Sequence, residues 1–206
     1  NDLDIMATVG LHPHEAKFYD EQNEALVKLI EDNKDVICGI GEAGYDFYYG
    51  HSTEEQQTIA FDFQLDLAKQ YDLALVIHTR DAWKQTFELL NKAGWPRRTV
   101  FHCFTGGPIE AKICVENGGI LSISGISTFK NAGDIREAIA SVPSEFLMGE
   151  TDSPWLAPVP YRGKLNEPAY VENVVEQICK TRFESHNEDE ETVKRYLFEN
   201  SERTFR

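Results

Sequence analysis

The chain has 206 residues, 41% of them hydrophobic and 11% aromatic, so it is long and apolar enough to bury a large core. Its net charge of −15 excludes a general nucleic-acid coat protein, because non-specific phosphate binding needs clustered Lys and Arg, but it does not exclude a local cationic pocket or bound metal ions.

No stretch approaches the roughly 20 apolar residues of a membrane span and the N-terminus lacks a signal-peptide pattern, which favours a soluble, cytoplasmic protein without a membrane partner. The absence of CxxC spacing predicts reduced, buried thiols at the four cysteines, Cys38, Cys103, Cys114 and Cys179.

Six short apolar segments, each followed by polar residues or glycine, predict buried strands. Their ends lie roughly 20 to 40 residues apart, which brackets the length of a βα unit. The segments are 6–10, 36–41, 73–77, 99–101, 119–122 and 146–149.

Helical patterns fill the intervals between these segments. The clearest covers residues 53–70 and begins at a capping box formed by Thr53 and Gln56, or by Ser52 and Glu55. The acidic run 188–191 is expected to be a solvated connection between the last two helices. The other expected helices are 20–33, 83–90, 135–139, 171–180 and 192–200.

Alternating strands and helices predict an α/β fold with a parallel sheet, either an open doubly wound sheet or a TIM (β/α)8 barrel. No GxGxxG or Walker loop follows any strand, and polar residues gather after the strands, which favours the barrel. Six strands cannot close an eight-stranded ring. We therefore expect one barrel domain over residues 1–206 from which the first two βα units are absent.

Four metal-binding side chains follow four different predicted strands: Glu42, His78, His102 and Asp152. A single histidine there is more often structural, and an aspartate before Ser-Pro usually forms a turn, but four equivalent placements favour a catalytic metal site. Imidazole and carboxylate ligands suit zinc, manganese, iron or magnesium. A bound divalent ion activates water for attack on an ester. Asp152 is then the expected general base, and Glu42 a bridge between two ions.

Cationic side chains near this site predict an anionic substrate. Arg80 follows His78 by two residues, although a salt bridge with Asp81 or with a carboxylate at the barrel mouth explains it equally well. Arg162 and Lys164 lie in a loop shaped by Pro and Gly, which favours phosphate binding over a plain solvated loop. His12 lies in an HxH pair, but Pro13 ends the strand there, so substrate contact is favoured over metal ligation.

Six ordered motifs resemble the TatD family of metal-dependent deoxyribonucleases: TVGLHPHEA, GIGEAGYDFYY, VIHTRDA, VFHCFTGG, SISGISTFKNA and GETDSPWLAPVPYRGKLNEPAYV. The resemblance implies a (β/α)8 barrel of the amidohydrolase superfamily that hydrolyses DNA with one or two divalent ions, Mg, Mn or Zn, typically from the 3′ end of single strands. It also implies metal ligation by the four residues named above. DNA is then the partner, and a monomer is expected.

The sequence departs from the family pattern at three places. An HxH metal pair on a first strand does not precede Asn1, Tyr45 replaces a leucine in the GLD motif, and Leu165 replaces a basic residue. Two other functions stay open. One is a small-molecule amidohydrolase or phosphoesterase on the same barrel, and the other is a non-catalytic barrel that lacks the HxH strand.

Overall fold

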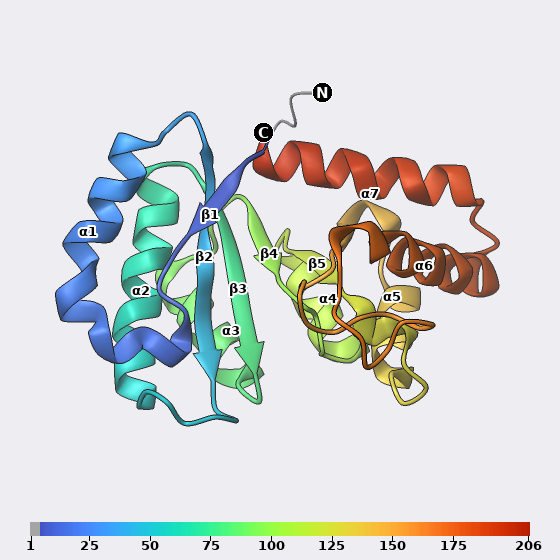
Figure 1. Cartoon of the computed structure of the whole chain (residues 1–206), viewed down its shortest axis with the longest axis horizontal. Helices are drawn as coiled ribbons and strands as arrows, with labels where there is room; N and C mark the ends of the chain where they lie inside the picture. The colour runs from blue at the N-terminus through green and yellow to red at the C-terminus, as the bar shows by residue number, and fades with distance from the viewer. Residues whose placement is uncertain (1–4) are drawn as a thin grey trace. The chain divides into compact units, whose positions relative to one another are not determined.

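The computed structural model describes residues 5–206 and divides the chain into two compact units (Figure 1). The first unit runs to His102 and includes Thr204–Arg206, and the second is Cys103–Arg203. All six predicted strands are present, and the strand pairs within each unit are parallel. The α/β class and the parallel pairing are therefore confirmed, while the expectation of a single domain stays a prediction.

The first unit contains four strands that pair in chain order: β1 (Ala7–Val9), β2 (Ile37–Asp46), β3 (Ala74–Arg80) and β4 (Thr99–Phe101). The expected ends of β2 and β3, at residues 41 and 77, were wrong, because both strands continue past their apolar segments. Backbone pairing needs no apolar side chain, and the ladder continues through Gly44 with His78 and Asp46 with Arg80. Glu42 and His78 thus lie within strands rather than after them.

Gly44 lets these two strands approach closely. A Cβ atom at this position would lie 2.0 Å from the backbone oxygen of His78, and the φ of Gly44 is +143°. Only glycine adopts this backbone conformation readily. The sequence therefore needs glycine here to hold the end of β2 against β3.

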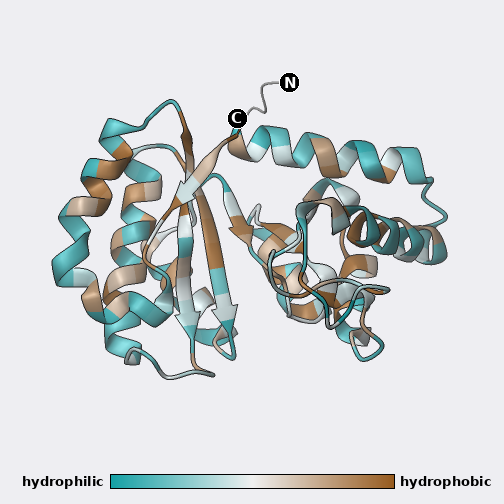
Figure 2. Ribbon diagram, viewed as in Figure 1, coloured by the Kyte–Doolittle hydropathy of each residue, from teal (hydrophilic) through white to brown (hydrophobic). Residues whose placement is uncertain are grey.

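Three helices cover the strands of the first unit: α1 (Tyr19–Asp32), α2 (Glu54–Gln70) and α3 (Trp83–Ala93). Thr53 and Gln56 form the capping box of α2, which confirms one of the two predicted pairs. In Figure 1, α1 and α2 lie side by side, and Figure 2 shows β3 hydrophobic along most of its length and hydrophilic at its carboxyl end. Burying each of the large side chains Phe61, Leu65 and Ile77 stabilises this unit by about 1.5–3 kcal/mol.

The second unit contains the parallel pair β5 (Ile120–Ile123) and β6 (Leu147–Gly149). Its helices are α4 (Pro108–Glu116), α5 (Gly133–Ser141), α6 (Val171–His186) and α7 (Glu190–Phe205). The sequence pattern does not predict α4, because the apolar residues of this short helix do not form a clear stripe. Its start is marked by Pro108 and by Glu110, which accepts a hydrogen bond from the backbone N–H of Gly107.

The acidic run 188–191 leads from α6 into the first turn of α7, and three of its residues are exposed as expected, but Glu188 is half-buried. Glu188 forms a salt bridge at 2.8 Å with Arg182, which is buried, and accepts a hydrogen bond from Ser144. Arg182 also donates to three backbone oxygens, those of Ile139, Ala140 and Val142. Glu190 and Glu191 form the first turn of α7, where acidic side chains favour the helix dipole.

Within residues 5–206 no cysteine forms a disulfide bond, and Cys38, Cys114 and Cys179 are buried, which confirms the prediction of reduced thiols for these three. Cys103 is only half-buried. Within residues 5–206, the helices are too short or too polar to cross a membrane.

Candidate metal site

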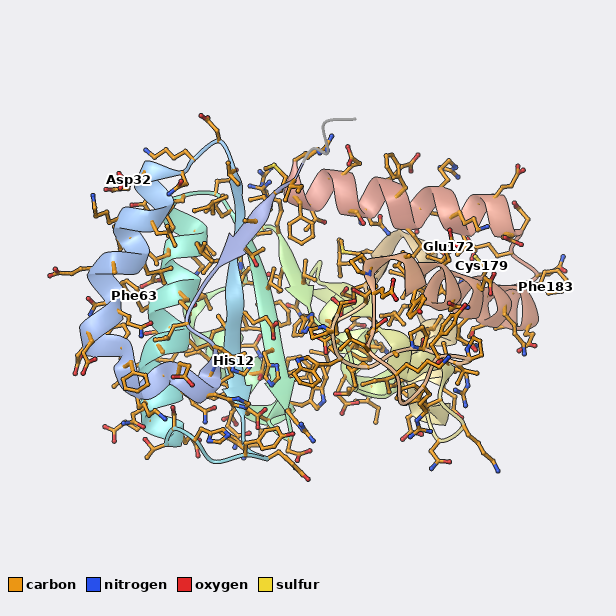
Figure 3. All side chains as sticks on the ribbon, viewed as in Figure 1. His12, Asp32, Phe63, Glu172, Cys179 and Phe183 are labelled. Atoms are coloured by element: carbon orange, nitrogen blue, oxygen red, sulfur yellow. The ribbon has the colours of Figure 1, made fainter. Side chains whose placement is uncertain are left out.

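The Glu42 carboxylate is surrounded by three imidazoles in the first unit. Its Oε2 atom lies 3.4 Å from Nδ1 of His78, 3.5 Å from Nε2 of His102 and 3.8 Å from Nε2 of His12. His12 is labelled in Figure 3, where it lies near the carboxyl ends of β2 and β3. The strands therefore bring together one carboxylate and three imidazoles that are far apart in the sequence.

The spacing of these atoms fits a shared cation. Two ligands about 2.1 Å from one tetrahedral ion stand roughly 3.4 Å apart, which is close to the separations of Glu42 from His78 and His102. His12 also brings a ring nitrogen within 4.8 Å of the ligand atoms of Glu42 and His78. The residues present therefore suit a divalent metal ion.

Asp46 fixes the orientation and tautomer of His78. Nε2 of His78 lies 3.0 Å from Oδ2 of Asp46, and because an ionised carboxylate only accepts hydrogen bonds, Nε2 carries the proton. The lone pair of the neutral ring is then on Nδ1, the atom that faces Glu42. A carboxylate behind a histidine is the arrangement that commonly orients metal ligands.

Asp46 itself is buried, with 1% of its surface exposed. Burial raises its pKa, but hydrogen bonds from the backbone N–H of Tyr49 and from His14 and His78 outweigh this and lower the pKa below its ordinary value. Asp46 is therefore ionised at neutral pH. Asp46 was not among the predicted site residues, although its position four residues after Glu42 in one strand places both side chains on the same face.

His12 faces Glu42 with Nε2, whereas His78 faces it with Nδ1. Nδ1 of His12 accepts a hydrogen bond from the backbone N–H of His14 at 3.2 Å, so in the neutral ring Nε2 carries the proton and faces Glu42 as a donor. Burial, followed by the nearby His78, lowers the pKa of His12 to about 4, so the ring is neutral at pH 7. This tautomer favours substrate contact over metal ligation, as expected, and that role stays a prediction.

Glu42 is ionised at neutral pH. Burial raises its pKa, but the interaction with His78 and the charges of His102, His78 and His12 outweigh it and lower the pKa to about 2. A carboxylate that stays charged is a strong ligand for a divalent cation.

Two glutamines of α2 hold the segments that carry this site. Gln64 accepts from the backbone N–H of Leu11 at 2.7 Å and donates to its oxygen at 3.0 Å. Gln57 likewise accepts from the N–H of Asp46 at 2.8 Å and donates to its oxygen at 3.1 Å. Both glutamines are buried, and their spacing of seven residues places them on one face of the helix. Two glutamines on the otherwise apolar face of α2 are a sequence pattern that could have indicated this role, but neither residue was predicted to support the site.

In the second unit, Asp152 follows β6 by three residues and has a left-handed backbone with φ 60°. Glu150 accepts hydrogen bonds from the backbone N–H of Cys103 at 2.5 Å and from the Ser122 hydroxyl at 2.7 Å, in line with a structural role. Buried Asn166 donates to the oxygens of Thr151 and Trp155 and so closes the loop that follows Asp152. The role of Asp152 as ligand and base stays a prediction.

The three predicted substrate cations lie against aromatic rings. Arg80 stacks on Tyr48, with its guanidinium carbon 3.9 Å from the ring centroid. Arg162 and Lys164 are exposed. Arg162 stacks on Phe129 at 4.3 Å, and Lys164 lies 5.7 Å from the ring of Tyr161.

Comparison with known proteins identifies relatives over the whole chain. The family model described as TatD related DNase matches residues 1–206. The uncharacterized metal-dependent hydrolase YabD of Bacillus subtilis is 36% identical over 98% of this chain and 78% of its own length. A protein of Erwinia amylovora named 3′-5′ ssDNA/RNA exonuclease TatD is 33% identical over 85% of this chain and 70% of its own.

The crystal structure of YJJV, a TatD homologue from Escherichia coli, superposes with a TM-score of 0.90. It is 29% identical, and the match covers 97% of this chain and 76% of that one. This likeness supports the expected TIM-barrel fold class. The family match covers residues 1–206, and the expectation that two N-terminal βα units are absent stays a prediction.

Proposed function

Since this chain belongs to the TatD family of metal-dependent hydrolases, we propose that it hydrolyses phosphodiester bonds of DNA and shortens single strands from the 3′ end. The observation that carries the proposal is the oriented pair of Glu42 and His78. An ionised carboxylate and an imidazole lone pair stand 3.4 Å apart, and Asp46 holds the imidazole from behind. This is the donor set of a hydrolytic metal site.

The proposed ligands are Glu42, His78, His102 and Asp152, with Glu42 shared where two ions bind. A divalent ion, Mg, Mn or Zn, would supply a Lewis acid that polarises the phosphate and makes water a nucleophile near neutral pH. Asp152 takes the proton of the attacking water. His12, whose Nε2–H faces Glu42, donates a hydrogen bond to a substrate oxygen.

The cationic residues Arg80, Arg162 and Lys164 bind phosphate oxygens in this proposal. In a chain of net charge −15, three local cations are needed to attract a polyanion. The name of the Erwinia amylovora relative, 3′-5′ ssDNA/RNA exonuclease TatD, supports nucleic acid as the substrate class. We expect the protein to act as a monomer in the cytoplasm.

Incubating the protein with a 5′-labelled single-stranded oligonucleotide and Mg²⁺, Mn²⁺ or Zn²⁺ tests the proposal. We expect a ladder of products that shorten from the 3′ end, and no products after EDTA treatment. Glu42→Gln and Asp152→Asn should abolish cleavage while leaving the circular dichroism spectrum unchanged. Glu116→Gln and Asp66→Asn change exposed acids on α4 and α2 and serve as matched controls.

Metal-loaded protein that leaves every DNA substrate intact but hydrolyses an amide or a small phosphate ester would contradict the proposal. That result would identify a small-molecule hydrolase instead. Protein that binds metal and hydrolyses none of these substrates would support the non-catalytic alternative.

A further inference from the structure

Two exposed tyrosines directly follow β2, next to the candidate metal site. Tyr48 has 60% and Tyr49 has 52% of its surface exposed. Their rings meet edge to face with centroids 4.8 Å apart. An adjacent pair of exposed aromatic rings next to the candidate site forms a candidate binding surface.

Arg80 completes this surface. Its guanidinium carbon lies 3.9 Å from the ring centroid of Tyr48 and 4.9 Å from that of Tyr49. The backbone oxygen of Arg80 accepts a hydrogen bond from Phe47, so the ends of β2 and β3 fix the three side chains beside one another. We call Tyr48, Tyr49 and Arg80 the tyrosine–arginine platform.

One carboxylate holds both the platform and the candidate metal ligand. Oδ1 of Asp46 accepts hydrogen bonds from the backbone N–H groups of Tyr48 at 3.0 Å and Tyr49 at 3.1 Å. Its other oxygen, Oδ2, accepts from Nε2 of His78 at 3.0 Å. The distance from the platform to His78 is therefore set by a single buried side chain.

A planar, electron-rich ligand with a negative charge fits this surface. Nucleobases stack on aromatic rings and on guanidinium planes, and Arg80 offers donors to an adjoining phosphate. In duplex DNA the faces of internal bases are already stacked on their neighbours, so only an unpaired base can bind in this way. We infer that the tyrosine–arginine platform stacks one nucleobase of a single-stranded substrate and thereby aligns the adjoining phosphodiester bond with Glu42 and His78.

This inference rests on the proposed function, but its test measures binding rather than cleavage. The full chain, loaded with Mn²⁺, is titrated into fluorescein-labelled phosphorothioate decathymidylate, which resists hydrolysis, and anisotropy is recorded. A second probe has the same backbone with abasic units in place of the bases. The variants are the double substitution of Tyr48→Leu with Tyr49→Leu, and the double substitution of both tyrosines to Phe, which keeps the rings. Tyr196→Leu is the matched control, because Arg195 stacks on Tyr196 at 4.6 Å in α7.

The double Leu variant should bind the base-containing probe roughly 5- to 150-fold more weakly, the range expected for losing one stacked base. The Phe variant and Tyr196→Leu should stay within about twofold of wild type. Wild type should bind the abasic probe as weakly as the double Leu variant binds either probe. If the double Leu variant does not fold, the affinities of wild type and of the Phe variant for the two probes still test the inference, because both proteins should bind the base-containing probe more tightly than the abasic one.

Equal binding of both probes by wild type, or unchanged binding by a folded double Leu variant, would overturn the inference. If such a protein still cleaves single-stranded DNA, the proposed function stands and the platform alone is refuted. If wild type neither cleaves natural DNA nor binds either probe, both are refuted.

Discussion

The carboxylate of Asp46 lies 3.0 Å from Nε2 of His78 and thereby decides which nitrogen of that ring is free. The carboxylate accepts a hydrogen bond from the N–H group at Nε2. The lone pair of the neutral His78 ring is therefore on Nδ1. A buried residue that touches no substrate thus determines whether His78 is able to bind a metal ion beside Glu42.

Replacing Asp46 with Asn is expected to weaken metal affinity and activity by about 10- to 100-fold. The side-chain oxygen of the new asparagine would accept the hydrogen bonds from the backbone N–H groups of Tyr48 and Tyr49, so its amide nitrogen would face His78. That nitrogen only donates, so Nε2 of His78 would have to be the acceptor. His78 then carries its proton on Nδ1 and loses the lone pair that faces Glu42. Calorimetric titration with Mn²⁺ or Zn²⁺ measures this, with Asp66→Asn as the exposed control. Unchanged affinity in the Asp46 variant would show that His78 does not bind metal through Nδ1.

Replacing Gly44 with Ala is expected to destabilise the protein by about 1–3 kcal/mol or more, and to weaken metal binding. The new methyl group would meet the backbone oxygen of His78 at 2.0 Å, so β2 and β3 would have to separate at the candidate site. Gly133→Ala is the control, because Gly133 lies in α5 with open space around it and should be neutral or slightly stabilising. Urea denaturation compares the two, and equal stability would contradict the close contact.

The metal-free protein is expected to lose stability as the pH falls below about 6.5. The pKa of His12 is 6.5 in its ordinary state and about 4 in the fold, so the unfolded chain binds the proton first. Neutral His12 therefore contributes its full share of the folding stability above pH 6.5, its pKa in the unfolded chain. This contribution is lost as the pH falls towards 4, its pKa in the fold. Urea midpoints of EDTA-treated protein across this window measure the loss. His12→Gln should flatten the pH dependence and His186→Gln should not; equal slopes in both would contradict the assignment.

The buried thiols are expected to resist alkylation in the folded protein. Burial raises the pKa of Cys38, Cys114 and Cys179, and only the thiolate is nucleophilic. A thiol reagent at pH 8 should therefore modify at most Cys103 before unfolding and all four cysteines afterwards. Rapid modification of Cys114 in folded protein would show that the core of the second unit is open.

The sequence predicted the strands well because all except β1 are largely buried apolar runs, and it placed Glu42, His78 and His102 near the carboxyl ends of their strands for the same reason. It did not predict how far β2 and β3 extend, since the last residues of both strands are polar and pair only through the backbone. It also missed Asp46, Gln57 and Gln64. Their importance depends on which backbone and ring atoms they meet, and those partners are distant in the chain.

Anomalous X-ray scattering from crystals grown with Mn²⁺ or Zn²⁺ shows directly whether Glu42 and His78 bind a metal ion together. The predicted result is an ion coordinated by Oε2 of Glu42 and Nδ1 of His78, at about 2.0–2.2 Å, with Asp46 still bonded to Nε2 of His78. An ion bound through Nε2 of His78, or full metal occupancy elsewhere with none beside Glu42, would contradict it.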